Sequence, residues 1–455
     1  MSHPLTSDTL QSKLDELFEM ERLALERLIA SGAYLFLDAT SPNQPRRKCE
    51  SINGDHSVYR VDIKGVQIYL DEMDRVAERF SNLNLNGYFP SENEIPHPKA
   101  DLRFLEIVGE NDFPLECDEM WKLTSRSSID LFHTKFTSPT ILFFEGRNNL
   151  LSMNGVHSLK SFEILVNDSL HIDIDLTHAR FDGELIIGSH PARTGRASVT
   201  FNSSSADICR FLCGRLTFNT PKFTGTSFRD KAEFHNISFE EYADFRRVKL
   251  SNGALFDRCD FSRAPDFHDA ELHQNTVFQK CNFETKKCSV VDVSSFRLLK
   301  VHYGKMRDTK HELNFYALEH RAERISTKNG IMVSILSWLY DEVSEYGASI
   351  EKTVFTFIYW NLDFFLIFLW VTSSQRDSQL IKVSNETLST YPALMLTFQN
   401  IFNPLALFSG KSLVSVNNLA VYMASLLQGL GSIAILALML FAIRGRFRKG
   451  SSSES

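Results

Sequence analysis

The sequence predicts a mixed fold: an N-terminal α+β region, a β-solenoid, a helical linker and a membrane domain of two α-helical spans. Two observations carry this prediction. Large apolar residues recur at every eleventh position between positions 223 and 283, and two long apolar runs lie near the C-terminus. The predicted boundaries are 1–31 for an N-terminal amphipathic helix, 32–140 for an α+β domain, 141–293 for the solenoid with clear repeats at 218–285, 294–350 for a helical cap or linker, and 351–455 for the membrane domain.

The composition excludes several classes of protein. Lys and Arg total 49 against 56 Asp and Glu, a net charge of −7, so no nucleic-acid partner is expected. Seven cysteines without a Cys-x-x-Cys pair predict neither a zinc site nor a disulfide framework, and no metal or cofactor is expected. No hydrolase, metalloprotease or dinucleotide-binding motif occurs, so the chain is not expected to be an enzyme. The polar N-terminus lacks a secretory signal, which favours reduced thiols in the cytosol.

The segment 1–140 permits only coarse predictions. Leucines among Glu and Lys at 8–29 predict an amphipathic helix, which could serve oligomerisation or pack on the next domain. Strand-like segments at 58–63 and 102–108 and a helical segment at 71–80 predict a mixed α+β region. No motif indicates its role.

The repeat consists of two interleaved series of large apolar residues, and each series recurs at every eleventh position. On an α-helix, steps of five and six residues would turn the two series in different directions, and on a flat strand a step of five changes the face. The spacing therefore predicts a chain that turns about every five residues, so that all these side chains point to one axis. The predicted solenoid core is Phe223, Phe228, Phe234, Phe239, Phe245, Leu250, Phe256, Phe261, Phe267, Leu272, Phe278 and Phe283.

The position two residues before each of these side chains is small or β-branched in most repeats, and never charged. Such residues suit a second inward-facing layer. Cys259 and Cys281 belong to this layer, and we interpret them as packing residues and not as ligands.

This pattern resembles that of the pentapeptide-repeat proteins, in the variant where five- and six-residue steps alternate. The resemblance implies a right-handed coil with four faces, so that each coil takes two of the eleven-position repeats, and weaker copies reach back through Phe211, Phe201 and Phe181. The segment 294–326 could cover one end of the solenoid, and Thr309-Lys310-His311-Glu312 within it has the pattern of a capping box that opens a helix.

Two C-terminal segments, 353–372 and 420–443, are long and apolar enough to span a bilayer. Basic residues follow the second segment directly at 444, 446, 448 and 449, which predicts a cytoplasmic C-terminus and, with two spans, a cytoplasmic N-terminus. The shorter run 331–340 predicts an interfacial helix, with Trp338 and Tyr340 at the depth of the lipid headgroups.

The segment after the repeats resembles a bacterial subgroup that joins two membrane spans to pentapeptide repeats. Phe315-Tyr316, Glu319, Trp338-Leu339-Tyr340, Tyr346-Gly347 and the arginine-rich end of the last span carry this resemblance. It implies a location in the bacterial inner membrane and a likeness to two-helix ion channels with a pore segment between the spans.

The candidate pore-lining residues are polar residues in or between the spans. Asp363 lies near the middle of the first span, and a ring of such carboxylates could line a cation pathway. The alternative is a structural carboxylate that is either protonated or paired, with Asn361 or Gln428 of a neighbouring helix as its partner. Between the spans, 391–407 is an apolar run interrupted by Gln399 and Asn400, and both a re-entrant pore helix and a membrane-surface helix fit it.

The leading hypothesis is a membrane protein in which a cytosolic repeat domain senses or binds something and controls a pore. Two helices cannot enclose a channel, so this hypothesis requires a homo-oligomer, with contacts through Ser425-x-x-x-Gly429 or similar small residues. The expected partners are the lipid bilayer, further copies of the chain, and a cytosolic protein or ligand. The alternative is a non-conducting scaffold that recruits a protein partner to the membrane.

Overall fold

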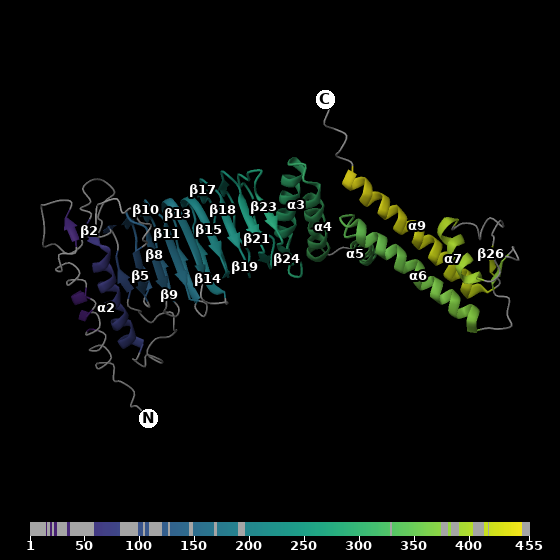
Figure 1. The fold of residues 1–455 in the computed structure, drawn as a ribbon, viewed down its shortest axis with the longest axis horizontal. Helices are drawn as coiled ribbons and strands as arrows, with labels where there is room; N and C mark the ends of the chain where they lie inside the picture. Colours follow the sequence, from purple (N-terminus) through teal and green to yellow (C-terminus); the bar gives the residue numbers. More distant parts are fainter. Residues whose placement is uncertain are drawn as a thin grey trace, which may run out of the picture. The chain divides into compact units, whose positions relative to one another are not determined.

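The computed structural model (Figure 1) describes residues 15, 19–20, 22–24, 34–36, 59–81, 99–102, 105–108, 121–125, 128–144, 149–167, 171–189, 196–327, 330–374, 381–383, 391–403, 414–416 and 418–447. The chain divides into two compact units, Met1–Lys287 and Cys288–Ser455. The predicted helix at 8–29 lies mostly outside the described residues, although the six described within it are helical.

The first unit contains two large sheets. In hydrogen-bonded order, the first sheet comprises β1 (Tyr34–Phe36), β2 (Tyr59–Asp62), β4 (Leu105–Val108), β7 (Lys135–Phe136), β10 (His157–Ser158), β13 (Arg180–Ser189), β15 (Asp207–Gly214), β18 (Ala232–His235), β21 (Ala254–Asp257) and β23 (Val277–Gln279), joined at the side by β5 (Trp121–Ser125), β8 (Thr140–Phe144), β11 (Phe162–Val166), β17 (Ser227–Phe228) and β20 (Lys249–Leu250). The second comprises β3 (Lys99–Asp101), β6 (Ser128–Asp130), β9 (Asn149–Ser152), β12 (His171–Asp175), β14 (Ala197–Asn202), β16 (Leu216–Phe218), β19 (Ser238–Phe239), β22 (Asp260–Phe261) and β24 (Asn282–Phe283).

Nearly all strand pairs in these sheets are parallel, and residues 123–283 form a β-solenoid of about seven turns, as the repeat predicts. In its regular part, the rings of every second repeat stack directly on one another. Phe256 lies between Phe234 and Phe278, with ring centroids 4.7 Å apart on both sides, and Phe223 stacks on Phe245 at 4.6 Å. These distances match the spacing of adjacent strands, so one coil takes two repeats.

The structure places ten of the twelve predicted core side chains in the buried interior. Leu272 and Phe283 differ, because they are only half-buried. Both belong to the last turn of the solenoid, and Phe283 lies on β24, which ends the second sheet. The side chains therefore have a neighbouring coil of the solenoid on one side only.

The coils turn at residues with left-handed backbone conformation. One such column contains Ser205, Gly225, Arg247 and Asp269, with φ between 56° and 69°. The amide nitrogens of the first three donate to the next coil; that of Arg247, for example, lies 3.0 Å from the carbonyl oxygen of His268. The sequence shows no common residue type at this corner, because the hydrogen bonds between coils impose the conformation on arginine as well as on glycine.

The parallel ladders begin before residue 141, the boundary that the sequence predicted, since β5 already pairs with β8 and β6 with β9. The first turns bury Leu123, Ile129 and Leu142 together with Phe136 and Phe144, so phenylalanine does not recur at every eleventh position there. The register also shifts between Phe181 and Glu184. Because the coils differ in length here, the apolar residues lack a fixed spacing, and the sequence pattern did not reveal the first turns.

The strands β2 and β4 lie within the two predicted strand segments, whereas α2 (Ile63–Ser81) contains the predicted helix at 71–80 and begins eight residues earlier. Within the described residues, β5 has a partner strand on one side only. The side-chain amide of Gln67 on α2 accepts from the backbone nitrogen of Thr124 at 2.8 Å and donates to its carbonyl oxygen at 3.1 Å. The helix thus satisfies part of this strand edge.

The second unit is mainly helical, with α3 (Val290–Lys305), α4 (Thr309–Ser326), α5 (Ile331–Ser344), α6 (Ile350–Ser374), α7 (Pro392–Phe402), α9 (Leu419–Phe447) and an antiparallel pair, β25 (Ile381–Val383) and β26 (Val414–Val416). The predicted helix start at Thr309 is confirmed, but Thr309 is not the cap. Asp308 caps α4, because its carboxylate accepts from the backbone nitrogen of His311 at 3.2 Å.

Candidate functional site

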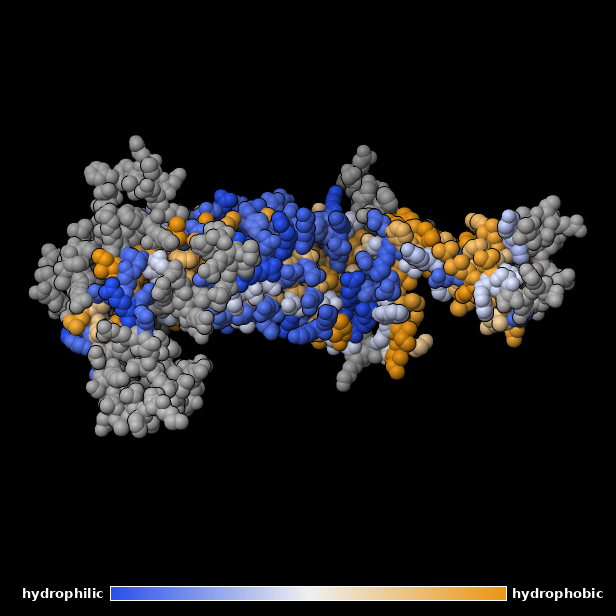
Figure 2. Space-filling view, turned by 60° about the horizontal axis from the view of Figure 1, so that its bottom comes forward, coloured by the Kyte–Doolittle hydropathy of each residue, from blue (hydrophilic) through white to orange (hydrophobic). Residues whose placement is uncertain are grey.

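Two helices, α6 and α9, are long and apolar enough to cross a membrane, by length and composition. Most of their outward side chains are apolar, among them Phe355, Trp370 and Phe441, which are 59%, 70% and 62% exposed. Figure 2 shows hydrophobic side chains over these helices, whereas most of the visible solenoid surface is hydrophilic. This surface would be unfavourable in water.

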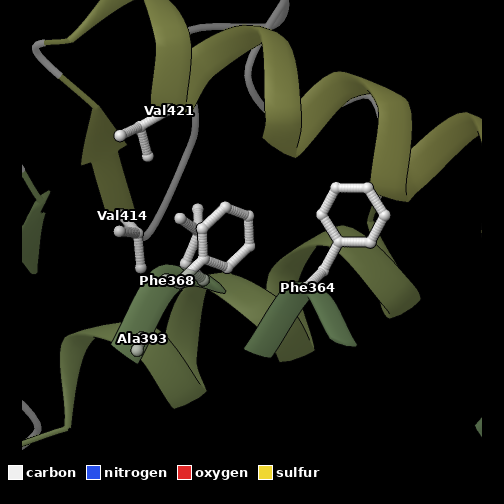
Figure 3. Packing of buried hydrophobic residues seen from close by; sticks show 6 residues of the cluster. Phe364, Phe368, Ala393, Val414 and Val421 are labelled. Atoms are coloured by element: carbon white, nitrogen blue, oxygen red, sulfur yellow. The ribbon is translucent and has the colours of Figure 1, made fainter. Parts of the chain in front are cut away.

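A compact apolar core joins α6, α7 and α9 into one assembly, which we call the hairpin. Phe368 is fully buried, and its ring lies beside Val414 and near Ala393 of α7 (Figure 3). Gly431 on α9 permits close packing, because a Cβ atom there would lie 2.5 Å from the ring of Trp360. The ring nitrogen of Trp360 donates to the backbone oxygen of Gln428 at 3.2 Å.

A buried polar network crosses the middle of the hairpin. The amide nitrogen of Gln428 donates to the side-chain oxygen of Asn361 at 3.0 Å, and Ser432 donates to the same oxygen at 3.0 Å. Asn400 on α7 donates to Gln428 at 2.8 Å and to Ser425 at 2.5 Å. Three helices are thus linked by neutral amides and hydroxyls, which satisfy one another inside an apolar assembly.

Gln399 extends this polar centre to β26. Its side-chain oxygen accepts from the backbone nitrogen of Val414 at 2.9 Å, while its buried amide nitrogen has no hydrogen-bond partner in the described part of the chain. Four of the five candidate pore-lining residues, Asn361, Gln399, Asn400 and Gln428, therefore lie inside a single copy of the hairpin.

Asp363 is separate from this network. It is the fourteenth of 25 residues in α6 and lies on the outer face of the helix. Its outward neighbours one turn away, Tyr359 and Ile367, are 63% and 47% exposed. Among the described residues its carboxylate has no hydrogen-bond or ion-pair partner. Within one chain Asp363 therefore pairs with neither Asn361 nor Gln428, and those two amides bind each other.

Ser425 and Gly429 are buried within their own chain, where Ser425 accepts a hydrogen bond from Asn400. The prediction that Ser425-x-x-x-Gly429 forms contacts between copies is therefore wrong, because α7 already covers this face of α9.

The depth of α7 in the hairpin follows from its contacts. Gln428 is the tenth residue of α9, about 14 Å along the helix axis from its first residue. Since Asn400 binds Gln428, the C-terminal end of α7 reaches this level of the hairpin. With 11 residues, α7 is too short to cross a bilayer. Residues 404–407 of the predicted pore segment lie outside the described residues.

A helix, α5, is present at the segment 331–340, for which the sequence predicts an interfacial helix. Its first turns carry strongly exposed apolar side chains: Ile331, Met332, Leu336 and Trp338 are 81%, 71%, 61% and 54% exposed. Its C-terminal end is held by the protein instead, because Asp341 forms ion pairs with Arg321 at 2.8 Å and Arg324 at 3.0 Å on α4.

Tyr346, between α5 and α6, is the residue on which these contacts converge. Its hydroxyl lies 2.7 Å from that of Ser337 and accepts from Arg324 at 3.2 Å, and its ring stacks on His320. It is 4% exposed and has a left-handed backbone, with φ of 54°. We call these contacts the joint at Tyr346. In the sequence only the Tyr346-Gly347 pair indicates it, because the partners of Tyr346 come from α4 and α5.

A further ion cluster joins α3 to α4. Glu319 is 4% exposed and accepts from Arg297 and from Lys300, both at 2.6 Å. Burial raises the pKa of Glu319, but the hydrogen bonds from the two cations outweigh it and hold the pKa below its ordinary value. The carboxylate therefore stays charged and fixes the helix pair.

In the described part of the chain, no group of three or more His, Cys, Asp or Glu side chains could hold a metal ion. Comparisons of the chain with family models, with curated proteins and with solved structures found no match. A functional conclusion therefore rests on the geometry of the chain itself.

Proposed function

We propose that the chain is a membrane protein whose hairpins assemble from several copies into a cation-conducting pore, under the control of the solenoid as a cytosolic sensor or binding domain. Asp363 is the observation that carries this proposal. A carboxylate in the middle of a lipid-facing helix costs about 2.5–3.5 kcal/mol on insertion scales. The carboxylate of Asp363 avoids this cost if it faces a polar path formed together with other copies, because water and cations solvate it there.

The arrangement of polar groups supports the same conclusion. Since Asn361, Asn400 and Gln428 bind one another, the only charged side chain in the middle of α6 is left for contacts outside the chain. Each copy would place one Asp363 on the shared axis, with α6 inward. The exposed residues of α9 before Arg444 are apolar, such as Leu427 and Leu430, and they then face lipid.

The position of α7 supports a re-entrant segment more than a surface helix. A helix on the membrane surface would lie across the ends of the spans, whereas α7 ends at the level of Gln428, well inside the hairpin. Non-helical backbone at this depth is tolerated where protein or a water-filled cavity surrounds it.

The solenoid supports an assignment to the pentapeptide-repeat type, with two repeats in each coil and stacked phenylalanines. On this proposal the protein belongs to a bacterial inner membrane, with both termini in the cytoplasm. Contacts from α4 through Asp341 and Tyr346 would pass movements of the cytosolic part to α6.

The test is ion flux through liposomes that contain the purified full-length protein. Asp363→Asn keeps the size of the side chain and removes the charge, so we expect the preference for cations over anions to fall at least several-fold. Asp363→Glu is the matched control and should retain the preference. Equal selectivity in all three proteins, or no flux in any of them, would contradict the pore.

A membrane-tethered scaffold is the second candidate, and one observation favours it. Asn361, Asn400 and Gln428 find their hydrogen-bond partners within one hairpin, so the spans could anchor a monomer. The mass of the protein in detergent separates the two functions: a pore requires several copies, and a monomer would favour the scaffold.

A further inference from the structure

Cys259 and Cys281 occupy the same position in two consecutive coils of the solenoid. The residues that follow them, Asp260 and Asn282, are paired in register, and the backbone nitrogen of Asn282 donates to the carbonyl oxygen of Cys259 at 2.9 Å. The Cα atoms of such residues on neighbouring strands lie about 4.8 Å apart. This distance is within the range found between the Cα atoms of disulfide-bonded cysteines.

The two thiols point in the same direction, each toward the coil that precedes its own. Cys281 donates to the carbonyl oxygen of Phe256 at 3.2 Å, and that residue belongs to the coil of Cys259. The sulfur of Cys259 lies 3.4 Å from the carbonyl oxygen of Phe234, the equivalent residue one coil earlier. The sulfur of Cys281 therefore reaches across the gap between the coils, to the strand beside which Cys259 lies.

The two cysteines differ in exposure and acidity. Cys281 is half-buried, whereas Cys259 is fully buried. A hydrogen bond from Cys259 lowers the pKa of the Cys281 thiol, while that same hydrogen bond and burial raise the pKa of Cys259. Because the thiolate is the nucleophile, Cys281 is the residue that a reagent in solution meets first.

We propose that Cys259 and Cys281 form a reversible disulfide when the protein meets a peroxide. The Cys281 thiolate attacks one peroxide oxygen, the O–O bond breaks, and hydroxide leaves and takes up a proton to become water. The sulfur of Cys281 is thereby oxidised to a sulfenic acid. Cys259 then attacks this sulfur, the S–O bond breaks, and a second water leaves as the S–S bond forms. A dithiol reverses the change.

The disulfide would fasten the last two coils of the solenoid, which include the end strands β23 and β24. Fraying of these strands would require the two coils to separate, and a covalent link prevents this. The disulfide would form whether or not the hairpins conduct ions.

The experiment treats the full-length protein with hydrogen peroxide and digests it with trypsin without reduction. Cleavage after Arg258, Arg263, Lys280 and Lys286 separates the two cysteines, so mass spectrometry should find peptides 259–263 and 281–286 joined, and free again after dithiothreitol. Hydrogen exchange in β24 should slow several-fold in the oxidised protein.

Cys259→Ala supplies the decisive variant, and the fold should tolerate it because alanine fills the same layer at Ala232 and Ala254. Without its partner, Cys281 should stop at the sulfenic acid, which dimedone labels; Cys209→Ala is the control and should still form the disulfide. The proposal is wrong if peroxide leaves both peptides reduced, or oxidises Cys281 to a sulfinic acid in the unaltered chain without joining them.

Discussion

Both the solenoid and the hairpin bury apolar side chains, but among the described residues only the hairpin also encloses a network of amide side chains. The regular coils enclose phenylalanines and carry charged groups outside, whereas the hairpin encloses Asn361, Asn400 and Gln428 and exposes large apolar residues. Water selects the first arrangement through the hydrophobic effect. The second suits an apolar solvent, in which polar groups gain by facing each other. One chain thus contains two cores with different driving forces.

The largest expected difference comes from truncating one buried ring in each region. Phe256→Ala should lower the local free energy of unfolding by about 3–5 kcal/mol, because it removes a fully buried ring between two others. Phe368→Ala in the hairpin should cost clearly less, since lipid or detergent is as apolar as the core and only packing is lost. Hydrogen exchange of β21 and α6 in micelles measures the loss of local stability in the two variants. Equal losses of stability would contradict the proposed difference between the two cores.

A smaller effect is expected where the solenoid depends on the absence of a side chain. A Cβ atom at Gly183 would lie 2.4 Å from the carbonyl carbon of Lys160, at the register shift of β13. Backbone cannot rotate away as a side chain can, so Gly183→Ala should destabilise the solenoid by about 1–3 kcal/mol.

Gly214→Ala is the matched control, because its added Cβ would meet the nearest atom at an ordinary 3.6 Å. Urea unfolding followed by circular dichroism should separate the two variants. Equal midpoints would mean that the register shift relaxes freely.

In the hairpin, the corresponding test removes a polar group. Gln428→Leu leaves the amide of Asn400 without one of its acceptors and Asn361 without one of its donors. We expect a loss of about 1 kcal/mol, within the range of hydrogen bonds between membrane helices. Thermal unfolding in detergent measures it, with Leu427→Ala on the exposed face as the control. A variant more stable than the unaltered chain would show that the network is not needed for packing.

The sequence predicted the solenoid core better than the hairpin core, for a physical reason. A repeated coil places equivalent residues at fixed spacing, so the position of Phe234 predicts that of Phe256. The partners of Asn361 lie 67 and 71 residues away and follow no period. Sequence alone could therefore mark these amides as unusual, but not distinguish a pore lining from a network within one chain.

The left-handed corners and the joint at Tyr346 were not predicted, for a related reason. Arg247 adopts φ of 56° because the next coil holds its backbone, and the contacts of Tyr346 come from α4 and α5. Both depend on neighbours that only the folded chain brings near. Asp363 was found because a carboxylate in an apolar run is visible in the sequence itself.

The smallest expected effect concerns pH, to which the two regions should respond differently. Asp182 accepts from His157 at 2.7 Å, Arg229 at 2.8 Å and Arg180 at 3.0 Å, and these donors hold its pKa well below the ordinary value. Its folded pKa is lower than its unfolded pKa of about 3.9, so the stabilisation is complete above that pH and is lost as the pH falls through the folded pKa.

Acid should therefore increase hydrogen exchange in β13 before it affects α6 or α9, whose buried polar network consists of neutral amides and hydroxyls. Asp182→Asn should weaken the acid dependence in β13, since the charge that protonation would remove is already absent. Asp173→Asn, at a carboxylate that is 52% exposed, is the control and should keep the acid response of the unaltered chain. If α6 and β13 lost protection from hydrogen exchange at the same pH, the charged groups of the solenoid would not explain a difference in acid stability between the two regions.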